Sequence, residues 1–251
     1  MAKKLAILQS NYIPWKGYFD LINSVDEFVL YDDMQFTRRD WRNRNKIKTQ
    51  QGTQWLTIPV VQERGHHGNQ RICDTQVADK DWGEKHWNAL LRSYARSRYF
   101  DEFKAIFRDI YADDQETHLS RLNFNFISAI NAILGIKTKL SWSSDYRLEG
   151  DRTERLANIC VQAGADVYVT GPSALAYMEP GVFLTHNITV KVADYSGYPA
   201  YAQPFPPFDH FVTILDLIFG EGYEAVRFMK TFGSEESRGA FLHAAVASVA
   251  G

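Results

Sequence analysis

The sequence has few of the features that usually reveal a protein's function directly. Only 2 of its 251 residues are cysteine, and Cys73 and Cys160 lack the spacing of a zinc site or a redox pair. No apolar run approaches the roughly 18 residues of a membrane-spanning helix, and the first residues show no secretory signal. The formal net charge of −2 provides no broad positive field for nucleic acid. We therefore expect a soluble cytoplasmic protein with no membrane insertion and no nucleic-acid partner.

Sequence motifs for phosphate loops, hydrolases and metal sites are also missing. The first predicted turn lacks Gly-x-Gly-x-x-Gly and the Walker pattern, which argues against an ordinary dinucleotide or NTPase cradle. The segment Gly171-Pro172-Ser173 has no Gly-x-Ser-x-Gly, which disfavours a hydrolase nucleophile. His66 and His67 are adjacent, and no third ligand is spaced to complete a metal site with them. We expect no metal site, and the sequence specifies no cofactor.

Short apolar runs alternate with helical spacing along most of the chain. The runs predict buried strands, at 5–8, 28–31, 138–142, 167–170 and 188–192. The amphipathic spacing predicts helices, from about Pro14, over 153–163 and over about 211–219. Residues 46–61 predict two further strands around a turn, with Pro59 marking an edge or a strand end. The alternation predicts an α/β fold with a mostly parallel central sheet flanked by helices.

The middle of the chain interrupts this alternation. Residues 82–98, 99–112 and 117–134 have apolar positions at helical spacing, and Gly135 follows where a left-handed C-terminal residue belongs. We predict an inserted or appended helical subdomain at about 80–137. Residues 62–80 read as a mobile loop. The predicted organisation is one α/β domain over 1–232 and a partly ordered tail over 233–251.

Two carboxylates follow the second predicted strand. Asp32 and Asp33 stand at a strand end, which is where open α/β sheets bind ligands. Successive residues of a strand point to opposite sides, so only one of the two is expected to face a cleft. A general base, an anchor for a sugar hydroxyl or a ligand of a divalent cation is one interpretation, and an Asx-turn or a helix cap is the other. We take this pair as the catalytic candidate.

A basic and aromatic run follows the carboxylates. Arginine presents a rigid fork to phosphate, and tryptophan offers a stacking face. The candidate ligand-binding residues of this run are Gln35, Arg38, Arg39, Trp41, Asn43, Arg44, Asn45 and Lys46. The run suits a small ligand that contains a pyrophosphate. A solvated basic loop is the plain alternative, and RNA binding is disfavoured by the charge elsewhere.

Further polar and aromatic residues complete the candidate ligand site. They lie in the first predicted turn and in two later loops: Gln9, Asn11, Tyr12, Trp15, Ser173, Tyr201 and Gln203. Ser173 has a helix N-cap as its plain alternative. For the aromatic run 195–208, packing on the sheet or a dimer contact is an equally good explanation, so a homodimer stays open. His86 could act as a base, although a structural histidine is favoured.

Several of these segments together resemble one protein family. They are Ala6-Ile7-Leu8-Gln9, Tyr12-Ile13-Pro14-Trp15-Lys16-Gly17-Tyr18-Phe19, Asp32-Asp33-Met34-Gln35, Trp41-Arg42-Asn43-Arg44-Asn45, Thr170-Gly171-Pro172-Ser173-Ala174 and Tyr201-Ala202-Gln203-Pro204. Over about 5–222 the chain resembles the WbqC-like family. Ser10 departs from the proline expected after the glutamine. The resemblance implies work in bacterial surface-polysaccharide (O-antigen-type) biosynthesis, on nucleotide-linked sugars, and it transfers no catalytic residue.

These observations lead to one functional hypothesis and one rival. The hypothesis is a transferase that moves an acyl or aminoacyl group onto the amine of a nucleotide-linked amino sugar. The rival is a non-catalytic module that binds a sugar nucleotide or accompanies a glycosyltransferase. The expected ligand is in both cases a small molecule.

Overall fold

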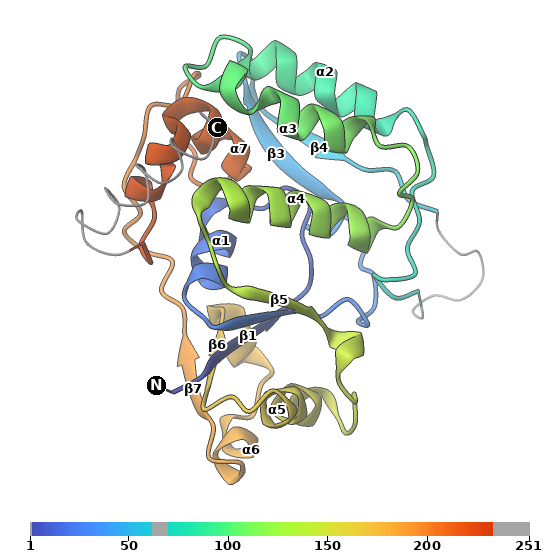
Figure 1. The fold of residues 1–251 in the computed structure, drawn as a ribbon, viewed down its shortest axis with the longest axis vertical. Helices are drawn as coiled ribbons and strands as arrows, with labels where there is room; N and C mark the ends of the chain where they lie inside the picture. The colour runs from blue at the N-terminus through green and yellow to red at the C-terminus, as the bar shows by residue number, and fades with distance from the viewer. Residues whose placement is uncertain (1, 62–69, 233–251) are drawn as a thin grey trace, which may run out of the picture.

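A five-stranded parallel sheet forms the centre of the molecule (Figure 1). The computed structural model describes residues 2–61 and 70–232. The strands are β1 (Lys4–Leu8), β2 (Glu27–Leu30), β5 (Lys139–Trp142), β6 (Val167–Thr170) and β7 (Thr189–Val192). Their order is β5-β2-β1-β6-β7, and every neighbouring pair is parallel. The predicted α/β class and the mostly parallel sheet are confirmed.

Helices cover both faces of this sheet. In Figure 1, α1 (Lys16–Asn23) and α4 (Leu119–Leu134) lie above it, and α5 (Arg152–Gln162) and α6 (Pro180–Thr185) lie below it. Side chains of β1 alternate between the two cores, because successive residues of a strand point to opposite faces. Ala6 packs with the α1 and α4 core, whereas Leu5 and Ile7 pack with the α5 and α6 core.

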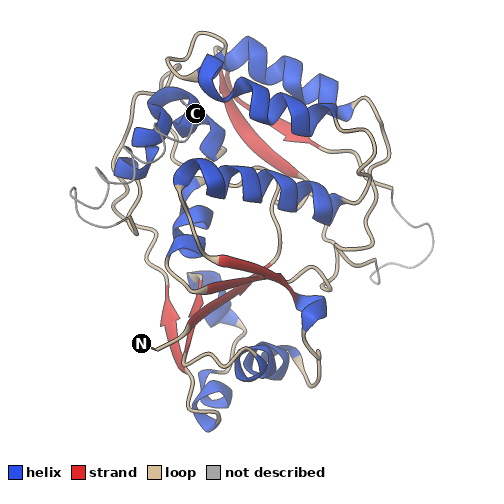
Figure 2. Cartoon of the chain, in the orientation of Figure 1, coloured by secondary structure: helices blue, strands red, loops and turns tan. Residues whose placement is uncertain are grey.

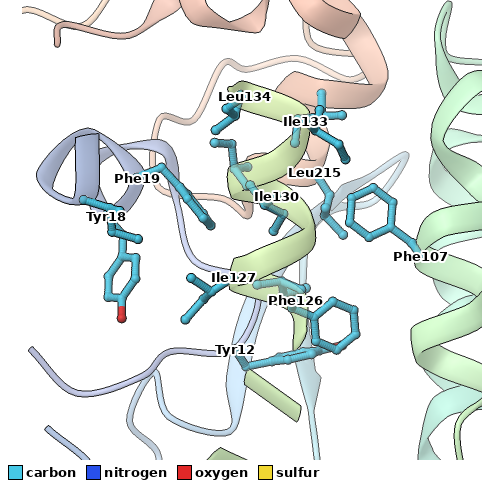
Figure 3. Packing of buried hydrophobic residues seen from close by; sticks show 14 of the residues in the cluster. Tyr12, Tyr18, Phe19, Phe107, Phe126, Ile127, Ile130, Ile133, Leu134 and Leu215 are labelled. Carbon is cyan, nitrogen blue, oxygen red and sulfur yellow. The ribbon is translucent and has the colours of Figure 1, made fainter. Parts of the chain in front are cut away.

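A second layer lies beyond α4. It contains the antiparallel hairpin β3 (Arg44–Thr49) and β4 (Gly52–Thr57), and the helices α2 (Trp82–Tyr94), α3 (Phe100–Ala112) and α7 (Ile214–Glu221). Figure 2 shows the hairpin and the main sheet on opposite sides of α4. Apolar residues of α4 therefore pack in several directions, and Figure 3 shows Phe126 beside Tyr12. Their rings are 5.5 Å apart between centroids.

Some element boundaries differ from the sequence prediction. Helix α1 begins at Lys16 rather than at Pro14, because Asn45 Nδ2 donates to the carbonyls of Tyr12 and Ile13 and Ile13 has a φ of 36°. Helix α2 ends at Tyr94, four residues before the predicted end. Gly135 does take the left-handed conformation, with a φ of 69°. Residues 233–251, the predicted tail, lie outside the described residues.

Short helical segments were not predicted at all. They are η1 (Ser143–Asp145), η2 (Pro172–Ala176), α6 (Pro180–Thr185) and η3 (Gly222–Phe228). Each is shorter than the window that helical periodicity requires. Of the predicted loop 62–80, the described part, 70–80, is tied down by isolated bridges, including Gln35 to Arg71 and Val60 to Val77. No helix in the described part of the chain is long and apolar enough to cross a membrane.

The connections that follow β1 and β6 run in opposite directions along the sheet. From β1 the chain passes through α1 to β2 on one side, and from β6 it passes through η2 and α6 to β7 on the other side. In Figure 1, α1 and α6 cover opposite faces, so the loops after β1 and β6 diverge at the carboxyl end of the sheet. Such a switch point is where open α/β sheets bind their ligands.

Candidate functional site

Polar side chains from three segments meet where β2 and β5 end. Asp33 follows β2, and its Oδ2 accepts a hydrogen bond from Ser143 Oγ at 2.6 Å. Its Oδ1 accepts from Arg71 Nη1 at 3.0 Å, so the carboxylate is held by a hydroxyl on one side and a guanidinium on the other. Arg71 also binds Asp74 through Nε at 2.6 Å. Asp33 remains half-buried and is the carboxylate of the pair that reaches the open edge of the sheet.

Asp32 points the other way, into the core below α4. It is 1% exposed, and its Oδ1 accepts from the Ser10 backbone N–H at 2.8 Å. Its Oδ2 accepts from Ser120 Oγ on α4. Burial raises the pKa of Asp32, and the hydrogen bonds from Ser120 and Ser10 offset part of that rise. Both carboxylate oxygens accept hydrogen bonds from protein groups. Asp32 therefore holds the turn after β1 in position.

The network continues from this carboxylate to Arg42. Asn123 Nδ2 on α4 donates to Ser10 Oγ at 3.0 Å and to the carbonyl of Arg42 at 2.9 Å. The guanidinium of Arg42 donates in turn to Asn11 Oδ1. The loop after β1 and the basic run are thereby joined through α4. Gln9 lies at the same edge, where its carbonyl accepts from Tyr18 Oη at 3.0 Å.

A pocket of about 420 Å³ lies in the basic run. Its walls come from residues before and within the hairpin: Phe36, Arg38, Arg39, Asn43, Arg44 and Thr57. No carboxylate is among these lining residues. Arg39 adopts a φ of 58°, and its carbonyl accepts a hydrogen bond from Arg44. Phe36 follows Asp33 by three residues, so their Cα atoms lie within about 11 Å of each other.

Two tryptophans form an open aromatic surface beside this pocket. The guanidinium carbon of Arg44 lies 4.1 Å from the ring centroid of Trp55. The rings of Trp55 and Trp41 are 5.3 Å apart, and the two residues are 42% and 40% exposed. Within the described part of the chain, Asn43 Oδ1 and Arg44 Nε are buried without a partner. Such atoms are normally satisfied, so two residues that line the pocket each have a buried polar atom without a partner among the described residues.

The structure brings Arg38, Arg39, Asn43 and Arg44 together, but it places other candidates elsewhere. Tyr12 is fully buried and contacts His86 Nδ1 at 2.8 Å. Lys46 pairs with Asp209 at 3.2 Å. The remaining candidates with protein partners are Trp15 against Tyr195, Asn45 on the carbonyl of Tyr12, Tyr201 on Asp216, and Gln203 on Asp209. These side chains hold the scaffold around the site and do not line the pocket.

Three further sequence interpretations are refined. Ser173 is exposed inside η2, whose N-cap is Gly171, so the N-cap interpretation of Ser173 is wrong. Gln35 is exposed and lies opposite Arg71. Burial lowers the pKa of His86 to about 4, so this histidine is neutral and structural at pH 7. His66 and His67 lie outside the described residues.

Several residues of the site were missed by sequence reasoning. Ser143 had a usable signal, because it directly follows a predicted strand at the sheet edge where ligands bind. Ser120 and Asn123 are polar residues three apart on an apolar helix, which is a pattern that marks a buried polar contact. Arg71 had no signal, since it lies in a polar segment without periodicity. No group of three or more His, Cys, Asp or Glu residues could hold a metal in the regions 2–61 and 70–232.

The open parallel sheet, flanked by helices on both faces, defines an α/β protein. The profile of the WbqC-like protein family matches residues 9–228, and the chain belongs to this family. A similar protein from Mycobacterium tuberculosis (strain ATCC 25618 / H37Rv), named Uncharacterized protein Rv1507c, is 50% identical over 228 residues. That alignment covers 91% of this chain and 98% of the mycobacterial protein. No solved structure matches.

Proposed function

We propose that the protein is a transferase of bacterial surface-polysaccharide biosynthesis, which moves an acyl or aminoacyl group onto the amine of a nucleotide-linked sugar. The observation that carries this proposal is the pocket lined by Arg38, Arg39 and Arg44 without a carboxylate. Three arginines that line one cavity favour a ligand with several negative charges, because a guanidinium can donate paired hydrogen bonds to phosphate.

The surroundings of the pocket suit the other parts of a sugar nucleotide. The exposed ring of Trp41 offers a stacking face to a base, an interaction that is worth about 1–3 kcal/mol. Asn43 lines the pocket, and its Oδ1, which has no partner within 2–61 and 70–232, is the acceptor that we assign to a ligand hydroxyl. The Cα atom of Asp33 lies within about 11 Å of that of Phe36 in the pocket wall. A sugar bound through its pyrophosphate in the pocket could therefore bring its amine to Asp33. The pyrophosphate then occupies the arginine pocket, and the sugar extends toward the edge of the sheet.

Asp33 is the group that acts on the amine in this proposal. The amine nitrogen attacks the acyl carbon of an activated acyl donor, and a new nitrogen–carbon bond forms. The bond between that carbon and the donor's leaving atom breaks, and the electron pair departs with the leaving atom. Asp33 takes the proton that the amine loses, as a general base. Arg71 and Ser143 keep the carboxylate in place, and Asp32 positions the turn above it.

The rival function is a non-catalytic module that binds a sugar nucleotide. Cys73 does not separate the two functions. Burial and the carboxylates of Asp74 and Asp33 raise the pKa of its thiol to about 11. A thiol with that pKa supplies little thiolate nucleophile at pH 7. The transferase proposal does not need the thiol, since its acyl group passes directly to the amine.

Calorimetric titration with nucleotide-linked amino sugars, followed by mass spectrometry after addition of activated acyl donors, tests both functions. We expect binding, and an acyl mass added to one sugar nucleotide. Arg44→Gln should weaken binding at least tenfold, whereas the matched surface variant Arg92→Gln should not change it. Asp33→Asn should keep binding and lose transfer. Binding without transfer to any acceptor would favour the module, and no binding of any sugar nucleotide would reject both.

A further inference from the structure

A second pair of arginines lies at the carboxyl edge of the sheet, on the α5 side. Arg152 and Arg155 belong to the first turns of α5, and the guanidinium carbon of Arg152 lies 3.6 Å from the ring centroid of Tyr177. Tyr177 follows η2 and is 44% exposed. Both ends of this contact come from loops that leave the carboxyl ends of strands, β5 for α5 and β6 for η2.

The carboxylates nearest in sequence bind backbone N–H groups and form no ion pair with these arginines in the described part of the chain. Asp151 accepts the backbone N–H groups of Thr153 and Glu154 as the N-cap of α5. The carboxylate of Glu154 accepts the backbone N–H of Asp151, which completes the capping box. In the described ranges, neither Arg152 nor Arg155 forms an ion pair with a carboxylate, and Arg155 Nε donates only to the carbonyl of Gly150.

A buried hydroxyl group without a partner in the described part of the chain also belongs to the α5 side of the sheet. Tyr31 directly follows β2, is 6% exposed, and packs in the α5 core. Its hydroxyl has no hydrogen-bond partner in the described part of the chain. Tyr31 shares this core with Leu156 and Ala157, the residues that follow Arg155 on α5, and the charges that act on its hydroxyl include those of Arg155, Arg152 and Asp33. A buried hydroxyl left unpaired costs free energy, which a ligand oxygen would recover.

We propose that Arg152, Arg155 and Tyr31 form a second anion site, which binds the phosphate group of the activated acyl donor. This inference rests on the proposed transferase function and names the class of its donor, a phosphate-bearing acyl compound. The donor's phosphate lies on the α5 side of Asp33, and the sugar nucleotide lies on the side of the arginine pocket. Its acyl carbon then reaches the carboxyl edge of the sheet next to the base.

Inorganic pyrophosphate, titrated calorimetrically into the full chain, probes this site. The titration uses the Arg44→Gln protein, in which the first pocket is weakened, so that the remaining heat reports the second site. We expect pyrophosphate to bind this protein. Adding Arg152→Gln should weaken that binding about tenfold or more, and adding Tyr31→Phe should weaken it several-fold. Adding Arg92→Gln, the same charge change on the exposed side of α2, should leave it unchanged.

The outcomes separate this inference from the proposed function. If pyrophosphate does not bind the Arg44→Gln protein, or if Arg152→Gln and Arg92→Gln have equal effects, the second site is refuted. If no sugar nucleotide binds the wild-type chain, the proposed function fails while the Arg152 result still stands. In the transfer assay, Arg152→Gln should raise the KM of the donor and leave the KM of the sugar nucleotide unchanged. Thermal unfolding of each variant shows whether it is folded, and Tyr31→Phe keeps the buried ring.

Discussion

Ser143 Oγ donates a hydrogen bond of 2.6 Å to Asp33 Oδ2 and joins the ends of β5 and β2. Removal of this hydroxyl by Ser143→Ala should lower kcat about tenfold, because a hydrogen bond to a charged group contributes about 1.5–3 kcal/mol to its placement. The KM of the sugar nucleotide should not change, since Ser143 does not line the arginine pocket. Steady-state kinetics measure the effect. The control is Ser144→Ala, which changes the exposed neighbouring serine. An altered KM with an unaltered kcat would contradict the positioning role.

Asp32 and Asp33 should differ sharply in their effect on stability. Asp32→Ala leaves the N–H of Ser10 and the hydroxyl of Ser120 without an acceptor in the core, so the free energy of unfolding should fall by about 3 kcal/mol. Asp33→Asn changes a half-buried group at the edge and should alter that free energy by less than about 1 kcal/mol. Urea unfolding measures both. Equal losses for the two variants would show that Asp32 does not hold the first turn.

Trp41 and Trp55 should contribute to ligand binding in different ways. Trp41→Ala removes a stacking face and should weaken nucleotide binding about tenfold, by 1–3 kcal/mol. Trp55→Ala removes the ring under Arg44, and should weaken the binding of pyrophosphate as well as of nucleotides. Titration of each variant with inorganic pyrophosphate, in the Arg152→Gln background that weakens the second site, separates the two effects, since pyrophosphate has no base. An equal loss of pyrophosphate affinity in Trp41→Ala would contradict the assignment.

Glu27 should make the protein sensitive to acid. Burial alone would raise its pKa, but donors on Lys3, Tyr146 and Lys139 outweigh burial and lower the pKa of Glu27 from 4.5 to about 2. The folded protein keeps this charge at a pH where the unfolded chain already binds a proton. The stabilisation is therefore complete above pH 4.5 and is lost as the pH falls toward 2.

The variant Glu27→Gln tests this dependence. Because Lys139 is 67% exposed and water screens its charge, the variant should lose about 2 kcal/mol of unfolding free energy at pH 7. Near pH 2 the wild type and the variant should have similar stabilities. Urea unfolding between these two values measures the difference. A difference that stays constant across the range would show that the charge of Glu27 does not carry the stabilisation.

The sequence alone predicted the elements that depend on local spacing. The five strands of the sheet were predicted from short apolar runs. This signal has a clear cause in β2 and β6, which are buried at every position, because a strand buried on both faces needs apolar residues in succession. The helices α4 and α5 were predicted from apolar residues at helical spacing, and Gly135 from the left-handed turn that glycine favours. The start of α1 was misplaced, because the side chain that holds the preceding turn, Asn45, is distant in the sequence.

The sequence predicted which segment contains the candidate site, but it did not predict which residues of that segment lie together. From the sequence, Arg38, Arg39, Arg44 and Lys46 were equivalent basic residues of one run. In the folded chain the three arginines line one pocket, while Lys46 pairs with Asp209 from a segment near the C-terminal end of the domain. The alternation of side chains along a strand implied that Asp32 and Asp33 face different ways, and α4 decided which of them is buried.

The sequence by itself determined the class of fold and the segment in which the charged and aromatic residues gather, because periodicity and composition act over a few neighbouring residues. Only the tertiary structure decided that Arg71 and Ser143 hold Asp33, and that Arg152 and Tyr31 lie at the same edge. The physical reason is that hydrogen bonds and charges act over a few ångströms, and the packing of α4 and α5 on the sheet sets those distances between residues far apart in the chain.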